Sequence, residues 1–246
     1  MSIPKIIHYC WFGGGPISEA DRKCMESWKK YCPDYKIIKW NDQNFEISTN
    51  RYAQQAYEAK KYAFVSDYVR LAVLYEYGGI YLDTDVELVR PLDELLELPG
   101  FMGFQTNNEV ATGLGFGARK GNSVVQALLR DYDALDFLKA DGSADLTPCP
   151  ERNTKVLQTL GVRVDGTRQS IAEMEIFPAE YFCPMEFATR KLRVTPKTYS
   201  IHRYAESWKP KPSAVSRILQ RLLKKHYYTW YCPLRGRIEG RLRKRT

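Results

Sequence analysis

Two aspartates separated by one residue, Asp83 and Asp85, follow a short apolar segment and are the residues best placed to do chemistry. Carboxylates two positions apart, where a strand gives way to a turn, can share a divalent cation, and such hard oxygen ligands suit Mg²⁺ or Mn²⁺. Ions of this kind usually bind through few carboxylates together with substrate phosphates, so the pair could hold a diphosphate. A D-x-D pair also occurs in ordinary surface turns, so its meaning depends on the segment that delivers it.

That segment, Ser66 to Glu87, reads as a helix, a glycine pair and a short buried strand. Ser66 is the expected N-cap, Gly78-Gly79 allows a left-handed C-cap, and residues 80–82 form the strand that delivers the aspartates. Asp67 and Arg70 then lie at i and i+3 on one helix face, near its positive end. The same spacing is found in surface ion pairs worth about 0.2–0.5 kcal/mol, and this alternative stays open at this point.

The rest of the chain must position this segment, and its first sixty residues predict alternating strands and helices. The expected elements are a strand over Ile3–Phe12, a helix over Ser18–Tyr31 capped by Ser18, a strand over Tyr35–Trp40 and a helix over Tyr52–Lys60. A β-α-β-α order indicates an α/β sheet with a parallel core. Trp11, at the end of the first strand, could stack on a nucleobase or simply pack in the core.

Beyond the aspartates the pattern predicts shorter elements separated by loops. These are a helix over Leu92–Leu98, a strand over Phe101–Phe104, a polar and glycine-rich loop over Gln105–Ala118, a helix over Asn122–Tyr132, a loop over Asp136–Arg152, a helix over Asn153–Leu160, and edge strands over Ile176–Pro178 and Tyr181–Pro184. Proline bounds each of the last two, as is typical of edge strands.

Composition indicates a globular chain in a reducing compartment. Hydrophobic residues make up 44% of the chain and aromatic residues 13%, enough for a packed core and too much for a disordered protein. No apolar run approaches the about 20 residues of a membrane span. The N-terminal residues show no secretory signal, and the six cysteines form no C-x-x-C pair. We therefore expect a cytoplasmic location.

The positive charge is concentrated at the C-terminus. Residues 209–246 hold twelve Lys or Arg and one acid, a net +11, which leaves −3 for the first 208 residues of a chain of net charge +8. From Val215 to Tyr227 the apolar residues follow a helical spacing with basic residues between them. This pattern predicts an amphipathic tail, residues 211–246, on the anionic inner face of the cell membrane. Packing on the body is the alternative; no nucleic-acid motif accompanies the tail, so we expect no nucleic-acid binding.

The run AFVSDYVRLAVLYEYGGIYLDTDVELVRPL, together with IPKIIHYCWFGG near the start, resembles glycosyltransferase family 32. This family includes fungal α-mannosyltransferases and bacterial capsular or lipopolysaccharide transferases, and it is distantly similar to the clostridial glucosylating toxins. The resemblance covers residues 3–14 and 60–92 and continues more weakly to about residue 210. It implies an A-type, Rossmann-like glycosyltransferase fold over residues 1–210: α/β, with a mixed, mostly parallel sheet flanked by helices.

The resemblance also implies roles for single residues. Trp11 would stack on the nucleobase of a nucleotide-diphospho-sugar, and Asp67 and Arg70 would hold its sugar and phosphates. Asp83 would contact the ribose, the sugar or a metal-bound water, and Asp85 would ligate Mn²⁺ or Mg²⁺ directly.

Near residue 205 the run HRYAESW resembles the C-terminal motif of the family. His202 would be a third metal ligand or a phosphate donor, and Trp208 would cover the leaving group. A single histidine is also often structural, and this is the interpretation for His8 and His226.

The resulting hypothesis is a metal-dependent, retaining transferase that moves a hexose from a nucleotide sugar to a saccharide or glycolipid acceptor in polysaccharide, capsule or lipopolysaccharide synthesis. The resemblance implies retention of the anomeric configuration. Glu109 is only a weak candidate for a general base, and the lack of a convincing base suits a route in which the leaving phosphate takes the acceptor proton. A sugar nucleotidyltransferase is a second hypothesis, although Gly13–Pro16 has no neighbouring basic residue before Arg22. The third is a non-catalytic membrane-surface adaptor whose D-x-D is a turn.

Overall fold

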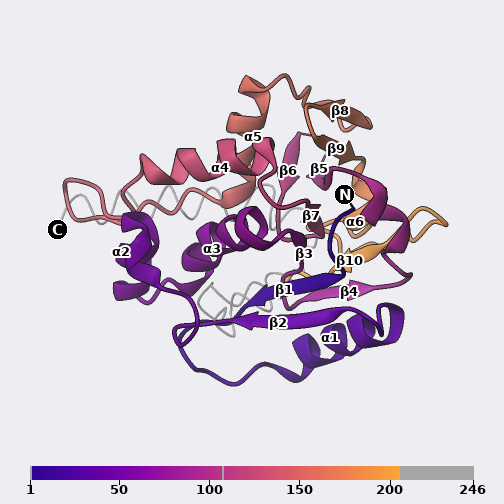
Figure 1. Ribbon diagram of the computed structural model, residues 1–246, viewed down its shortest axis with the longest axis horizontal. Helices are drawn as coiled ribbons and strands as arrows, with labels where there is room; N and C mark the ends of the chain where they lie inside the picture. The colour runs from indigo at the N-terminus through magenta and orange to yellow at the C-terminus, as the bar shows by residue number, and fades with distance from the viewer. Residues whose placement is uncertain (1, 107, 206–246) are drawn as a thin grey trace. The chain divides into compact units, whose positions relative to one another are not determined.

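An eight-stranded sheet organises the larger of two units, which comprises Met1–Pro184 and Val194–Ala205. The computed structural model describes residues 2–106 and 108–205. In this range the strands are β1 (Ile6–Cys10), β2 (Lys36–Trp40), β3 (Gly79–Tyr81), β4 (Val86–Leu88), β5 (Gly100–Thr106), β6 (Glu109–Ala111), β7 (Phe116–Ala118), β8 (Gln169–Ile171), β9 (Met174–Phe177) and β10 (Ser200–His202). The sheet order is β2-β1-β3-β7-β5-β9-β8, with β6 paired to β5, and β4 pairs with β10 in a separate two-stranded ribbon (Figure 1).

The sheet is mixed and its strands run mostly in one direction. β1 is parallel to both β2 and β3, and β5 is parallel to β9. β7 lies antiparallel between β3 and β5, so β2, β1, β3, β5 and β9 share one direction, while β7, β6 and β8 oppose it. The predicted mixed, mostly parallel α/β sheet is confirmed. Because β1 and β3 are parallel neighbours, the residues that follow them emerge at the same edge of the sheet.

Helices cover this sheet on both sides. They are α1 (Glu19–Tyr31), α2 (Arg51–Glu58), α3 (Tyr62–Tyr77), α4 (Ser123–Asp133), α5 (Cys149–Thr159) and α6 (Ala179–Phe182), with 3-10 turns η1 (Ile47–Thr49) and η2 (Asp93–Glu97). Figure 1 shows α2, α3 and α4 grouped on one side of β1 and α1 on the other. One buried apolar cluster contains residues of α2 to α5, and a second contains residues of α1, η2 and β4.

The cap of α1 forms as predicted. The Ser18 hydroxyl accepts a hydrogen bond from the Asp21 N–H at 3.0 Å, which satisfies one of the free amides of the first turn. The buried face of α1 packs on β4, where the Trp28 indole N–H donates to the Val86 carbonyl at 2.7 Å. The helix therefore supports the strand that follows the D-x-D pair.

The predicted start of the central helix is wrong by one turn. α3 begins at Tyr62, and the Ser66 hydroxyl lies inside it and donates to the Tyr62 carbonyl at 3.1 Å. Burial of Phe64 and Val65 against the core extends the helix past the residue best suited to cap it. Its end is as predicted: Gly78 has φ +66° and Gly79 φ +111°, and a Cβ on Gly79 would lie 2.8 Å from the Ile6 carbonyl oxygen.

Five later predictions also differ from the structure. The expected edge strand over Ile176–Pro178 corresponds to β9, which is an interior strand paired with both β5 and β8. The helix expected over 92–98 is only the short 3-10 turn η2 (Asp93–Glu97), and the expected loop over 105–118 contains β6 and β7. The expected loop over 136–152 ends earlier because α5 begins at Cys149. Tyr181–Pro184 is not an edge strand: Phe182 closes the single turn of α6, where its ring stacks on Phe101 with centroids 5.6 Å apart.

The second unit comprises Met185–Arg193 and residues from Glu206 onward. Its described part is a tight turn in which Met185 and Leu192 form an antiparallel bridge. The basic tail and Trp208 lie outside the described residues, so the predictions made for them, and the boundary at residue 210, stay predictions. Among the described residues, no helix is long and apolar enough to cross a membrane.

Candidate metal centre

Three side chains with metal-ligand chemistry meet beside the central strands. Ligand atoms of Asp83, Asp85 and His202 all lie within 4.8 Å of one another. The two aspartates occupy the turn between β3 and β4, and His202 ends β10, whose antiparallel register places it opposite Val86. The ribbon of β4 and β10 thus brings a late histidine to the D-x-D pair, as predicted.

Asp85 is held from three directions. The His202 Nε2 lies 3.3 Å from Asp85 Oδ1, and the Ala205 N–H donates to Oδ2 at 2.7 Å. The Arg203 N–H donates to the Asp85 carbonyl at 2.9 Å. Burial raises the pKa of the Asp85 carboxyl, but the His202 ring and the Ala205 N–H outweigh it, so the pKa is lowered overall. Burial lowers the pKa of His202, and Asp85 more than reverses this and raises it to about 10. Without an added cation, the pair is a carboxylate and an imidazolium.

Arg70 joins α3 to the D-x-D pair. Its Nη2 lies 3.1 Å from both Asp67 Oδ1 and Asp83 Oδ1. The side chains of Arg70 and Asp67 are only 5% and 11% exposed, so the alternative of a surface ion pair is wrong. The guanidinium also contacts four further groups: the Thr112 hydroxyl, the Cys149 sulfur, the Ser66 carbonyl and the Tyr81 ring.

The pKa of Asp83 is shifted in the opposite direction to that of Asp85. Burial raises the pKa of its carboxyl, Arg70 lowers it and the neighbouring Asp85 raises it again, with a net increase. The Tyr81 hydroxyl donates to Asp83 Oδ1 at 3.0 Å. A Cβ on Gly113 would lie 1.9 Å from Asp83 Oδ2, so the carboxylate occupies the space that a side chain at position 113 would take.

The donor set fits a divalent cation. Asp83 and Asp85 repel each other, and a cation between them would remove this repulsion. Carboxylate oxygens suit Mg²⁺ and Mn²⁺, whereas neutral imidazole suits transition metals. Mn²⁺ therefore matches the two carboxylates and, after His202 loses its ring proton, the imidazole as well, and Mg²⁺ matches the two carboxylates. Arg70 is already paired with Asp67 and Asp83, so this group of side chains has a net negative charge that favours a divalent cation.

Trp11 lies at the same edge of the sheet. It directly follows β1, as the D-x-D turn follows β3, and its ring is half-buried. The indole N–H donates to the Gly15 carbonyl at 2.6 Å, which fixes the ring against the glycine-rich turn. Base stacking by Trp11 stays a prediction. His8, which we interpreted as structural, is fully buried in β1 between Trp40 and Gly78.

Sequence reasoning missed the residues that support Arg70 from the far side. Thr112 and Gly113 follow β6, and Asn153 on α5 donates to the Thr112 hydroxyl at 3.1 Å. Cys149, one turn before Asn153, contacts the guanidinium. One signal was available: α5 buries Cys149, Arg152, Asn153 and Thr154, a polar helix face that an ordinary core helix would not have.

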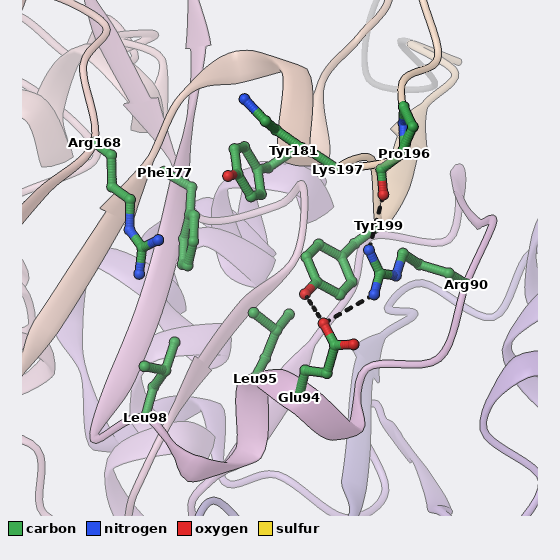
Figure 2. Close-up of a pocket in the computed structure, with 10 residues that line it drawn as sticks. All are labelled: Arg90, Glu94, Leu95, Leu98, Arg168, Phe177, Tyr181, Pro196, Lys197 and Tyr199. Atoms are coloured by element: carbon green, nitrogen blue, oxygen red, sulfur yellow. Dashed lines mark hydrogen bonds and ion pairs between the residues drawn. The ribbon is translucent and has the colours of Figure 1, made fainter.

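A separate hollow of about 370 Å³ lies at the other end of the β4 and β10 ribbon, beside Tyr199 (Figure 2). Its rim carries Arg90, Arg168 and Lys197. Each of these cations already has an acidic partner, as the Arg90–Glu94 pair at 2.8 Å in Figure 2 illustrates. The hollow therefore has little free charge, and the candidate site is the edge with the aspartates.

Comparison with known proteins agrees with this location. Residues 18–101 match the family described as "Glycosyltransferase sugar-binding region containing DXD motif". The matched region includes α3, Asp67, Arg70 and both aspartates of the D-x-D pair. The resemblance to DXD-containing glycosyltransferases that the sequence indicated is thereby confirmed.

Two yeast proteins and one solved structure are similar to this chain. Inositol phosphoceramide mannosyltransferase 3 of Schizosaccharomyces pombe is 30% identical over 148 residues, which are 55% of this chain and 39% of that protein. Mannosyl phosphorylinositol ceramide synthase SUR1 of Saccharomyces cerevisiae is 35% identical over 107 residues, 41% of this chain and 27% of that protein. The PaToxG glycosyltransferase structure has a TM-score of 0.49 and 22% identity, over 64% of this chain and 70% of that one. The chain thus spans well under half of the length of the two yeast relatives. The family match and the two yeast relatives support its classification as a glycosyltransferase.

Proposed function

We propose that this protein is a metal-dependent, retaining glycosyltransferase that moves a hexose from a nucleotide-diphospho-sugar to a saccharide acceptor. The observation that carries the proposal is the joining of Asp83, Asp85 and His202 to the buried Arg70–Asp67 pair at one edge of the sheet. Open α/β sheets bind ligands beyond the carboxyl ends of their strands, which is where this group lies.

The chain's residues divide into two sets in this proposal. Asp83, Asp85 and His202 would hold Mn²⁺ or Mg²⁺, which would supply positive charge to stabilise the departing diphosphate. With a cation compensating Asp83 and Asp85, the buried positive charge of Arg70 would be less fully neutralised by Asp83 and could stabilise the diphosphate. Asp67, fixed by Arg70, offers carboxylate oxygens to the sugar hydroxyls.

Two tryptophans complete the donor site in the proposal. Trp11 stacks on the base, supported by its position at the end of β1 next to β3. Trp208 covers the leaving group, a role that rests on the sequence motif HRYAESW alone.

The retaining route in this proposal follows from the family resemblance, and the weakness of Glu109 as a candidate base suits it. The Gln105 side-chain amide donates a hydrogen bond to Glu109 Oε2 at 2.8 Å, so one oxygen of this carboxylate is engaged within the chain. In this route the leaving phosphate oxygen accepts the proton of the acceptor hydroxyl while the new glycosidic bond forms on the same face of the sugar.

The acceptor in the proposal is a glycolipid or a lipid-linked saccharide. One relative is named an inositol phosphoceramide mannosyltransferase and another a mannosyl phosphorylinositol ceramide synthase, and both names describe a mannosylated lipid. The net charge of +11 in residues 209–246 would suit an anionic membrane surface, and we propose a peripheral location on the cytoplasmic face. Synthesis of surface polysaccharide or lipopolysaccharide would use such an acceptor.

Turnover of a panel of nucleotide sugars tests this function. The purified chain is incubated with uridine- and guanosine-diphosphate hexoses, with Mn²⁺ or with a chelator, and the released nucleoside diphosphate is measured. We expect Mn²⁺-dependent release from at least one donor, loss of it in Asp85→Asn, and an unchanged circular dichroism spectrum. Equal turnover in Asp85→Asn would refute the assignment, and linkage analysis of the product would test retention.

A further inference from the structure

An aspartate interrupts the buried face of α1. The buried residues of this helix are Asp21, Cys24 and Trp28, whose spacing of three and four places them on one face. That face packs on β4: Trp28 donates to the Val86 carbonyl at 2.7 Å, and the Leu88 N–H donates to the Ser27 hydroxyl at 2.8 Å. Core-facing positions of a helix are normally apolar, so an acid with 3% exposure at this position calls for a partner.

Helix capping provides hydrogen-bond partners for only part of the Asp21 carboxylate. Interaction with Ser18 lowers the pKa of the Asp21 carboxyl, as expected for an acid three residues after an N-cap. The second oxygen, Oδ1, is buried and has no hydrogen-bond partner among residues 2–106 and 108–205. A buried carboxylate oxygen without a donor is costly, which indicates that a group outside the described chain pairs with it.

The charge that Asp21 faces is that of the D-x-D pair. Burial raises the pKa of the Asp21 carboxyl, Ser18 opposes this, and Asp85 raises it further. Cys24, the next residue on the same face, has the pKa of its thiol raised by burial and then by Glu87 and Asp85. The same face of α1 packs on β4, which begins at Val86, the residue directly after Asp85. The carboxylates of Asp21 and Asp85 repel each other unless a cation lies near both.

We propose that Asp21 is an outer carboxylate of the metal centre, holding a water ligand of the cation through Oδ1. This inference rests on the proposed function. Asp21 is not among the three residues whose ligand atoms lie within 4.8 Å of one another, so it acts through water and not by direct ligation. Mg²⁺-type ions keep several water ligands, which gives such a residue a partner. Outer-shell groups of this kind change metal affinity by about 10–100-fold.

Direct titration with Mn²⁺, followed by the electron paramagnetic resonance signal of the free ion, tests the proposal without turnover. The variant is Asp21→Asn, and the matched control is Glu19→Gln, which removes the same charge from the same helix turn at an exposed position. We expect the dissociation constant for Mn²⁺ to rise about tenfold in Asp21→Asn. Glu19→Gln should bind like the parent protein.

A purely structural role for Asp21 predicts a different result. The metal-free Asp21→Asn variant would then melt at a lower temperature and bind Mn²⁺ with unchanged affinity, and this outcome would overturn the proposal. Asp21→Ser, which keeps a hydrogen-bonding group near Ser18, is a second variant in case the first folds poorly; it should show the same loss of affinity. Absence of Mn²⁺ binding by the parent protein would instead refute the proposed metal centre itself.

Discussion

His8 is held in its neutral form, so replacing it should change how the stability of the protein depends on pH. The Trp40 indole N–H donates to His8 Nδ1 at 3.0 Å, and the Gly78 carbonyl lies 2.9 Å from Nε2. Nδ1 is therefore the bare nitrogen and Nε2 carries the proton. A second proton on Nδ1 would face the indole N–H. Burial lowers the pKa of His8 from 6.5 to about 4, although the Gly78 carbonyl opposes the change.

The sign and size of the effect follow from this difference in pKa. Between pH 6.5 and pH 4 the unfolded chain binds a proton at His8 that the folded chain does not bind. The stabilisation is therefore complete above pH 6.5 and is lost as the pH falls through 4. Proton linkage gives a loss of about 2 kcal/mol between pH 7 and pH 5, and about 3 kcal/mol by pH 4.

Urea unfolding at pH 7 and pH 5 measures this term when the parent protein is compared with His8→Asn. Asparagine retains an oxygen that can accept from the Trp40 indole but does not titrate. Carboxylates that titrate in both proteins cancel in the comparison. We expect the parent protein to lose about 2 kcal/mol more than the variant over this interval. Equal losses in the two proteins would refute the assignment of a buried neutral histidine.

Two further substitutions test the arrangement around Asp83. Gly113→Ala should lower sugar transfer about tenfold or more, since its Cβ would lie 1.9 Å from Asp83 Oδ2. In a protein that already carries Asp83→Ala, this carboxylate is absent, so adding Gly113→Ala should have no further effect on urea unfolding. If Gly113→Ala still lowered the stability of the Asp83→Ala protein, the added Cβ would clash with a group other than the Asp83 carboxylate. Arg70→Lys should lower the free energy of unfolding by about 2 kcal/mol or more, because a lysine lacks the planar fork that places Nη2 on both carboxylates and Nη1 on the Thr112 hydroxyl. An unchanged urea midpoint would contradict the central position of Arg70.

Local signals made much of the first half of the chain predictable. Ser18 caps α1 because a hydroxyl satisfies a free amide in the same turn, and Gly78-Gly79 ends α3 because only glycine readily takes the backbone angles required there. The alternating strands and helices placed the D-x-D pair at the end of a buried strand. These features depend on residues a few positions apart, which a sequence shows directly.

The remainder depends on contacts between distant segments. Ser66 was expected to cap α3, but packing of Phe64 and Val65 in the core extends the helix by a turn. Thr112 reaches Arg70 only because β6 and β7 fold back beside β3 and β5, in a stretch that reads as a polar loop. The spacing of residues along the sequence does not predict a contact between segments this far apart. The approach of His202 to Asp85 could be expected only from the family resemblance.

Binding of nucleoside diphosphate measured by calorimetry, with and without Mn²⁺, tests the central claim most directly. Uridine and guanosine diphosphates are titrated into the parent protein, Asp85→Asn, and Asp34→Asn, which removes an exposed acid paired with Lys5. The account predicts that at least one nucleotide binds the parent protein and Asp34→Asn only with Mn²⁺, and that Asp85→Asn does not bind it. Binding that is equally tight without Mn²⁺, or that persists in Asp85→Asn, would contradict a metal-held diphosphate at the D-x-D pair.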